Sequence, residues 1–192
     1  RLEQGIEQSG SRVAVEYHSY QLYPDAPSSA PGHYHEALGA MKDLGANAVR
    51  EMIDKVTHIA TEEGLTMNWD KAQHVNTFQA HQLVYAAKAR GNDAEEAANL
   101  GAMAFERLFS AHFSEGLNVA DTDTLLEIAE DMGLDVEQVE IELESGEHAN
   151  AVRGDIRDAR SLGIQGVPFF VVGGKFGISG AQPADVYADT IN

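Results

Sequence analysis

The stretch from Gly163 to Gln182, GIQGVPFFVVGGKFGISGAQ, is the one around which the rest of the sequence is organised. It predicts a loop that leads into a β-hairpin. Phe169 to Val172 is a short run of aromatic and β-branched residues, which is typical of a strand. Gly173 and Gly174 tolerate the positive φ angles of a tight turn, and Lys175 to Ile178 then returns as the second strand.

The residues just before the hairpin indicate a special backbone conformation. Pro168 stands at the entrance of the first strand, where a residue without an amide hydrogen does not interrupt a ladder. A bond that precedes proline is also the one that adopts the cis form at modest cost. Gly166, two residues earlier, has no side chain and lets the backbone approach a neighbour closely. We therefore expect a shaped loop at this point rather than a simple connection.

A second strand signal lies near the start of the sequence. Arg1 to Ser9 has the spacing of a helix and is followed by Gly10, a residue that commonly ends helices. Apolar and polar residues then alternate from Val13 onward, which predicts a strand that runs to about Leu22. The segment from Tyr23 to Gly32 holds three prolines and breaks any regular element.

Helical periodicity dominates the rest of the chain. The stretches with apolar residues at helical spacing are 46–63, 78–89, 97–113, 122–132, 136–144 and 147–162. Four residues are suited to cap the amino ends of such helices, namely Thr77, Asp93, Asp121 and Asp135. The order of strand, helices, hairpin and helix predicts an α/β fold in which the helices form an insertion.

Four motifs together resemble the DsbA-like branch of the thioredoxin superfamily, and within it the FrnE-like proteins and the 2-hydroxychromene-2-carboxylate isomerases. They are Gly-Val-Pro-Phe-Phe at 166–170, Ser-Gly-Ala-Gln at 179–182, Asn-Thr-Phe-Gln-Ala-His at 76–81 and Leu-Phe-Ser-Ala-His-Phe-Ser-Glu-Gly at 108–116. The resemblance implies a thioredoxin-like fold with a large helical insertion. Residues 1–29 and 148–192 would form the thioredoxin-like core, and residues 30–147 the insertion.

The resemblance also implies a binding groove. Val167-Pro168 would be the cis-proline dipeptide that faces an active-site Cys-x-x-C, and Val167 would pair with an extended substrate backbone or with glutathione. The residues that it places at the groove are Gly166, Val167, Pro168, Asn76, Phe78, His81, Ser179 and Gly180. For two of these residues the sequence leaves a structural role open in place of a groove role, because Asn76 could cap a helix and His81 could pack in the core.

The chain contains no cysteine. In the resembling family a helix that carries Cys-x-x-C at its N-terminus leads into residues like Arg1-Leu2-Glu3, so the resemblance implies that the catalytic motif lies upstream of residue 1. The strand before that helix would be a middle strand, between the strand that begins at Val13 and the hairpin. The expected activity is thiol–disulfide exchange, with no catalytic residue in these 192 residues. The alternatives are a redox-inactive relative that binds a peptide or glutathione, and a glutathione-dependent isomerase.

Composition narrows the partners. The formal charge of −18 and the pI near 4.6 argue against nucleic acid or an anionic membrane as partner. We expect a substrate with a thiol or disulfide, which could be a peptide, a protein or glutathione, and no other cofactor. We also expect a cytoplasmic location and a homodimer. His33 with His35, and His112 with Glu115, are the nearest pairs for a metal, but neither has a third ligand at a telling spacing, so we expect no metal.

Overall fold

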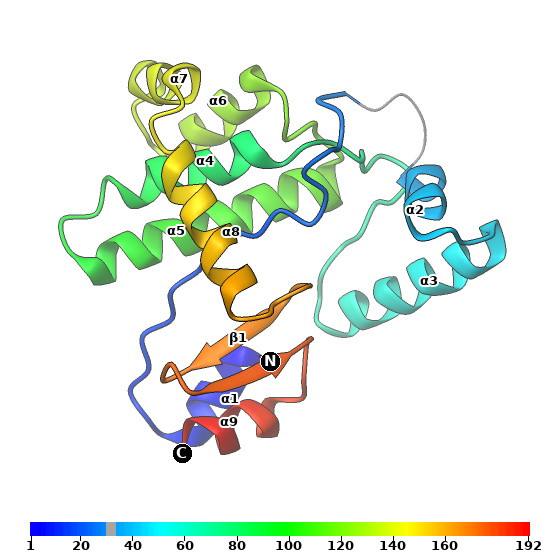
Figure 1. Ribbon diagram of the computed structural model, residues 1–192, viewed down its shortest axis with the longest axis vertical. Coiled ribbons are helices and arrows are strands. Elements are labelled where there is room, and N and C mark those ends of the chain that lie inside the picture. The colour runs from blue at the N-terminus through cyan, green and yellow to red at the C-terminus, as the bar shows by residue number, and fades with distance from the viewer. Residues whose placement is uncertain (30–33) are drawn as a thin grey trace. The chain divides into compact units, whose positions relative to one another are not determined.

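The computed structural model describes residues 1–29 and 34–192, and the chain divides into two compact units (Figure 1). Residues 1–22 and 153–192 form the first, here called the terminal unit, and residues 23–152 form the second, here called the helical unit. Gly32 and His33, which the sequence analysis singled out, lie outside the described residues, as does the start of the insertion expected at residue 30. Each unit is described by itself.

The terminal unit combines helices with a small sheet. Its elements are α1 (Leu2–Ser9), most of α8 (Ala149–Ser161), β1 (Phe169–Val172), β2 (Phe176–Ser179) and α9 (Ala184–Ile191). Within the described residues the sheet has two strands, which run antiparallel. The predicted hairpin and the helix that ends at Gly10 are thus confirmed.

The hairpin forms as its turn residues dictate. Phe169 pairs with Ser179 at one end of the ladder, and Val172 pairs with Phe176 at the other. Gly173 and Gly174 connect the strands with φ angles of 57° and 69°. Two successive positive φ angles give a turn whose twist matches that of the strands, and glycine adopts them without steric cost.

One face of the hairpin packs against α9. The rings of Phe170 and Tyr187 meet edge to face, with centroids 5.0 Å apart, and the cross-strand neighbour Ile178 is buried. Helix α1 crosses α9 at Gly5, where an added Cβ would lie 2.6 Å from both Ala184 O and Tyr187 Cβ. The absence of a side chain at residue 5 therefore sets how closely these two helices approach.

The predicted strand from Val13 to Leu22 is wrong. These residues adopt no helix or strand, and no ladder partner for them is found in residues 1–29 or 34–192. A strand needs a neighbour for its amide and carbonyl groups, and sequence alternation alone does not supply one. A carboxylate on α8 binds the segment instead, because Asp155 accepts hydrogen bonds from the Ser19 amide at 2.6 Å and contacts His18 Nδ1 at 2.8 Å.

The helical unit contains two separate apolar cores. Its elements are α2 (Tyr34–Lys42), α3 (Ala46–Glu62), α4 (Phe78–Lys88), α5 (Ala94–Phe109), the π-helical turn η1 (Ser110–Glu115), α6 (Thr122–Asp131) and α7 (Val136–Ser145). The main core lies among α4 to α7 and includes Leu83, Val84, Leu125, Ile128 and Val139. The small core joins α2 and α3 through Leu38, Val49 and Ile53, with Tyr34 and Trp69 packed against it.

Capping agrees with the sequence at three helices. Asp93, Asp121 and Asp135 each accept a hydrogen bond from the backbone amide three residues on, at 2.9 to 3.1 Å. Thr77 makes no such bond, and Asn76 Oδ1 accepts from the Phe78 amide instead. Short polar side chains at the entrance of a helix thus mark its start to within one residue.

Three features of the helical unit differ from the expectation. Helix α2 was not predicted from the sequence, because its start falls against the Pro/Gly-rich segment. The helix expected over 97–113 begins at Ala94 and changes into the π-helical turn at Ser110. Asp93 and Glu96 have the spacing of a capping box, which predicts a bond from the Asp93 amide to Glu96, but Glu96 Oε2 accepts from the amide of Asn92 instead, at 2.8 Å. In each case neighbouring backbone, not periodicity, sets the boundary.

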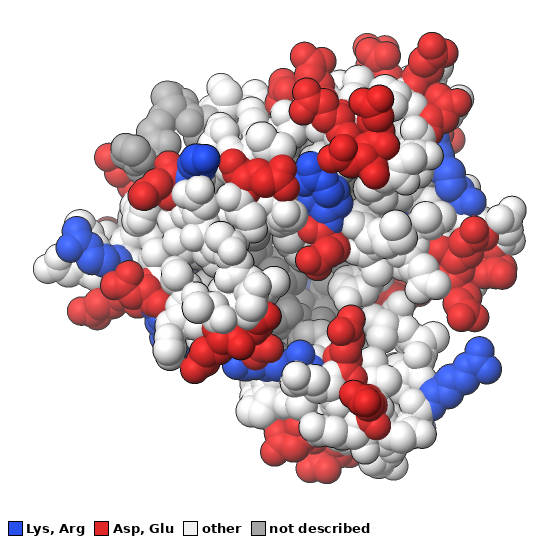
Figure 2. Space-filling view, turned by 180° about the vertical axis from the view of Figure 1, so that it is seen from behind, with Lys and Arg blue, Asp and Glu red and all other residues white. Residues whose placement is uncertain are grey.

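The negative charge of the chain is concentrated in the helical unit. Residues 23–152 hold 24 of the 31 acidic residues and 7 of the 13 basic ones, so they carry −17 of the formal −18. Figure 2 shows Asp and Glu side chains gathered at the top, where α6 and α7 lie. Because like charges repel, added salt is expected to stabilise this unit more than the terminal one. Within residues 1–29 and 34–192 no helix combines the length and apolarity needed to cross a bilayer.

Candidate functional site

The loop between α8 and β1 forms one end of the hairpin. Helix α8 is closed by backbone bonds from Gly163 to Arg160 O and from Ile164 to Ala159 O, both at 3.0 Å. The chain then continues to the Val167–Pro168 peptide bond, which the resemblance implies to be cis and which is cis in the structure. The Val167 residue is 48% exposed. A backbone segment that could meet a ligand therefore lies at the surface.

Five of the eight expected groove residues lie at this end of the hairpin, namely Gly166, Val167, Pro168, Ser179 and Gly180. The Gly180 amide donates a 2.9 Å hydrogen bond to Pro168 O, and Ser179 lies opposite Phe169 in the ladder. Gln182 fixes the far side of this corner, because its Nε2 donates to Ser179 O at 2.8 Å and its amide donates to the Tyr187 hydroxyl at 3.1 Å. The proline loop is thus held by the end of the same hairpin that follows it.

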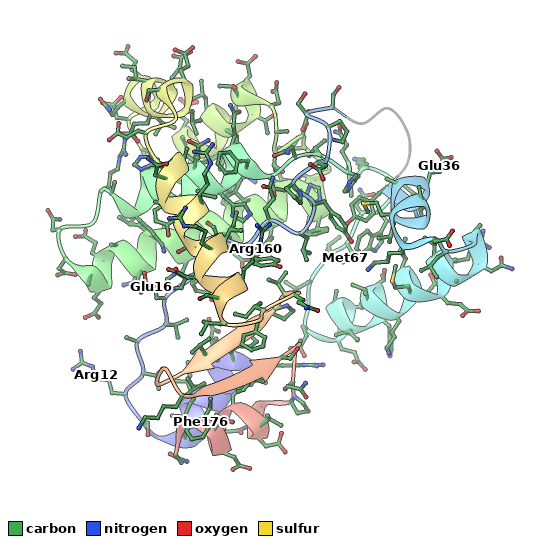
Figure 3. All side chains as sticks on the ribbon, viewed as in Figure 1. Arg12, Glu16, Glu36, Met67, Arg160 and Phe176 are labelled. Carbon is green, nitrogen blue, oxygen red and sulfur yellow. The ribbon has the colours of Figure 1, made fainter. Side chains whose placement is uncertain are left out.

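The outer edge of β1 has no ladder in the structure. Strand β2 pairs with one edge, and among the described residues no strand pairs with the other. Val171 on β1 and Phe176 on β2 are 49% and 59% exposed, and Figure 3 shows the Phe176 side chain on the hairpin. Such an edge presents amide and carbonyl groups that an extended chain can join as an added strand. Apart from Gly166 itself and its two chain neighbours, no atom of the described residues lies within 4 Å of the position of a Cβ at Gly166, so the close approach expected there is not made by this part of the chain.

The three remaining groove candidates belong to the helical unit. Asn76 holds the proline-rich segment, since its Nδ2 donates to Pro24 O at 2.8 Å and to Ala26 O at 3.2 Å, while its Oδ1 caps α4. Phe78 is the first residue of α4 and provides the capped amide. His81 contacts the ring of Phe105, with centroids 6.0 Å apart. These contacts are the capping and packing that the sequence left open as alternatives to a groove role.

A cluster of rings in the helical unit was not identified from the sequence. It comprises Tyr23, Tyr34, Trp69, His74, His112 and Phe113, whose ring contacts span 4.5 to 6.3 Å between centroids. We call it the ring cluster. Its members come from separate elements, so no local spacing reveals it. The one local signal was the motif at 108–116, which contains His112 and Phe113 and forms the π-helical turn.

Burial shifts the titration of several groups in the ring cluster. Burial, together with the smaller effect of the nearby His74, lowers the pKa of His112 to about 4. Burial also lowers the pKa of His74. The pKa of the Tyr34 hydroxyl is raised by burial and, to a smaller extent, by the neighbouring Tyr23. Both imidazoles are therefore neutral near pH 7.

The pairing of His112 with Glu115, weighed as a metal pair, does not occur. Glu115 is bound by Arg107, with Nη1 to Oε1 at 2.8 Å, and by the Ser110 hydroxyl at 2.9 Å. Arg107 also binds Asp131 at 2.8 Å and so connects the π-helical turn with α6. In residues 1–29 and 34–192, no three His, Asp or Glu side chains gather as metal ligands would.

Comparisons with known proteins place these features in a family. The family model of the DsbA-like thioredoxin domain matches residues 1–192. A crystal structure described as a probable DsbA oxidoreductase from Streptomyces coelicolor superposes with a TM-score of 0.84 at 28% sequence identity, covering 98% of this chain and 80% of that one. An uncharacterised Bacillus subtilis protein, YwbO, is 33% identical over 87 residues. That match spans 45% of this chain and 43% of the Bacillus protein.

Proposed function

Because the chain belongs to the DsbA-like thioredoxin domain family, we propose that it is the part of a thiol–disulfide oxidoreductase that binds the substrate, with the Cys-x-x-C motif upstream of residue 1. In this chemistry a thiolate attacks a disulfide, and a mixed disulfide forms and is then resolved by a second thiol. A helix N-terminus stabilises such a thiolate through its unpaired amides and its dipole. The residues of this chain would orient the substrate and would not themselves exchange electrons.

The observation that carries the proposal is the conformation of the Val167–Pro168 loop at an open edge of β1. Val167, the residue before the cis bond, is 48% exposed, and the Gly180 amide donates a hydrogen bond to Pro168 O. A substrate segment in extended form would pair with this backbone and so hold its disulfide in a fixed position. A peptide, a protein disulfide and glutathione all meet this requirement.

The segment from Val13 to Leu22 supports the same proposal. In the resembling fold a middle strand lies between this segment and β1, and residues 1–29 and 34–192 provide no such strand. A preceding strand that leads into the Cys-x-x-C helix would occupy that position beside β1 and would place the thiols opposite Pro168.

The lack of cysteine in these 192 residues favours a second candidate, a relative that binds a peptide or glutathione without redox chemistry. One experiment separates the two. Intact mass and N-terminal sequencing of the native protein would show whether a Cys-x-x-C precedes Arg1, and a fluorescent peptide disulfide would then report turnover. We expect the motif and turnover. A native N-terminus without cysteine, together with saturable glutathione binding, would establish the second candidate instead.

A further inference from the structure

The ring cluster joins the two apolar cores of the helical unit. Tyr34 and Trp69 pack against the small core of α2 and α3, whereas His112 and Phe113 lie on η1, whose Ala111 belongs to the main core. The contacts across the joint are Trp69 with Phe113 at 5.7 Å and Tyr34 with His112 at 6.2 Å between centroids. We call α2 and α3 together the arm. Tyr34 is thus the residue through which α2 meets η1.

One side of this joint is fixed by the backbone. Asn68 donates its amide to Phe113 O at 2.6 Å, and the Ser114 hydroxyl donates to Thr66 O at 2.7 Å. These bonds hold the segment between α3 and α4 on the π-helical turn. Tyr34 on the arm contributes ring contacts with His74, His112 and Trp69. One side-chain hydrogen bond, from Trp69 Nε1 to Thr57 Oγ1 on α3 at 2.8 Å, also ties the arm to this segment. Among the described residues no backbone hydrogen bond joins α2 or α3 to η1, so the arm side is the side that can separate.

The imidazoles of His74 and His112 in the ring cluster are held in the neutral form. His112 Nδ1 is shut off from solvent and has no hydrogen-bond partner among the described residues. The groups that face the two imidazoles are Tyr23, Tyr34 and Phe113, and the carboxylate of Glu115 is taken up by Arg107 and Ser110. A proton on His112 would therefore place a charge among rings with no carboxylate bound to it, which is costly.

We propose that the ring cluster is a pH-dependent latch, in which proton uptake by His112 and His74 releases Tyr34 and with it the arm. The sign follows from linkage. An imidazole in the open, solvated form titrates near its ordinary value of 6.5, whereas that of His112 in the closed form titrates near 4. Above about pH 7 the two forms bind protons equally and the latch stays shut. As the pH falls from 6.5 to 4, the ratio of open to closed molecules rises by about 80-fold for His112 alone.

Hydrogen exchange tests the latch on the full-length protein. We would compare backbone amides of α2 and α3 at about pH 6.5 and about pH 5, corrected for the intrinsic exchange rate. The linkage relation predicts about a 15-fold rise in the opening ratio of the arm over this interval. Amides of α6, in the main core, serve as the internal reference and should not change. Trp69 is the single tryptophan of the chain, so its fluorescence should report the loss of the Tyr34 contact in the same range.

Variants assign the effect to the imidazoles. His112→Phe keeps a ring but cannot take up a proton, so the 15-fold rise that His112 accounts for should vanish, and His74→Phe in the same chain should remove any further rise. His58→Gln on α3 is the matched control, because that imidazole is solvent-exposed and bound only to Glu62 at 3.4 Å. His112→Gln replaces His112→Phe if the latter does not fold. An unchanged opening ratio in the unmodified protein, or a full rise in the double variant, would overturn the latch.

Discussion

The Pro168 carbonyl and the Gly180 amide are joined by a 2.9 Å hydrogen bond, although twelve positions separate the two residues in the chain. The bond closes the end of the hairpin ladder just beyond the Phe169–Ser179 pair. The loop that carries Val167 is therefore an extension of the sheet rather than a mobile connection. Substitutions at the exposed Val167 side chain should affect binding far more than folding.

Val167→Asp tests this separation. Because the Val167 residue is 48% exposed, the free energy of unfolding should change by less than about 0.5 kcal/mol. If the proposed function holds, a charge beside the paired substrate backbone should lower kcat/KM for a peptide disulfide by about tenfold. Val171→Asp is the matched control, because Val171 is 49% exposed and lies on β1, the strand that follows the loop. Equal losses of activity in both variants would assign the effect to the hairpin as a whole.

Gly5→Ala should destabilise the protein although alanine favours helices. The added Cβ would lie 2.6 Å from Ala184 O and from Tyr187 Cβ, so α1 and α9 must move apart. Overpacking of this kind costs about 1–3 kcal/mol, and the gain in helix propensity offsets about 0.5–1 kcal/mol of it. Gly154→Ala in α8 has only Arg157 Nη2 nearby, at 3.8 Å, and should be neutral or stabilising. Urea unfolding of both variants measures the difference, and equal stability would show that the crossing adjusts freely.

Gly116→Ala should be more harmful than Gly133→Ala. Both glycines end a helical segment with positive φ, at 76° and 72°, so alanine pays about 1–2 kcal/mol at either position. Only at Gly116 does the new methyl group also meet Lys71, whose side-chain Cβ it overlaps and whose backbone C lies 2.8 Å away. We expect a further loss of about 1–3 kcal/mol there. Thermal unfolding of the pair isolates the contact, and a Tm for Gly116→Ala no lower than for Gly133→Ala would exclude it.

Glu142 should make the helical unit sensitive to acid. Its burial alone would raise the pKa of the carboxyl, but hydrogen bonds from Arg90, His148 and Gln138 outweigh it and the pKa is lowered overall. The folded form thus releases its proton more readily than the unfolded form, so the stabilisation is present above the unfolded value of 4.5 and is lost as the pH falls through the folded value. Glu142→Gln should abolish that part of the pH dependence.

The same substitution should also cost stability near pH 7. Arg90 Nη1 lies 2.7 Å from Glu142 Oε2, and a hydrogen bond to a charged group contributes about 1.5–3 kcal/mol. Glu144→Gln is the control, because Glu144 lies two residues further along α7 and is exposed. This substitution should change neither the stability at neutral pH nor the dependence of stability on pH in acid. Denaturant titrations between neutral and acidic pH measure both quantities. A Glu142→Gln slope equal to that of the unmodified protein would contradict the assignment.

The local signals in the sequence were sufficient for the hairpin and for most helix starts. Gly173 and Gly174 adopt positive φ angles, which glycine tolerates best. Asp93, Asp121 and Asp135 each accept a hydrogen bond from one backbone amide in the first turn of their helix. These features depend on neighbours within a few residues. A single sequence contains that information directly.

The features that sequence reasoning missed depend on distant partners. Val13 to Leu22 has the alternation of a strand, but whether it becomes one depends on a neighbour to pair with. His112 was considered with Glu115, three residues away, whereas its actual neighbours, Tyr34 and His74, lie far from it along the chain. Likewise, the proline loop could be recognised from its motif. Its hydrogen bond to Gly180 could not be predicted, because that bond depends on the register of the hairpin.

The bond between Ser19 and Asp155 has a consequence for synthesis of the protein. Its partners are 136 residues apart, and the terminal unit as a whole is assembled from the two ends of the sequence, on either side of residues 23–152. At translation rates of about 5–20 residues per second, residues 1–22 wait on the order of ten seconds before α8 and the hairpin emerge from the ribosome. The helical unit, by contrast, is continuous and can close before then. During that interval the apolar side of α1 has no α9 to cover it, so this helix of the nascent chain is exposed to chaperones and to aggregation.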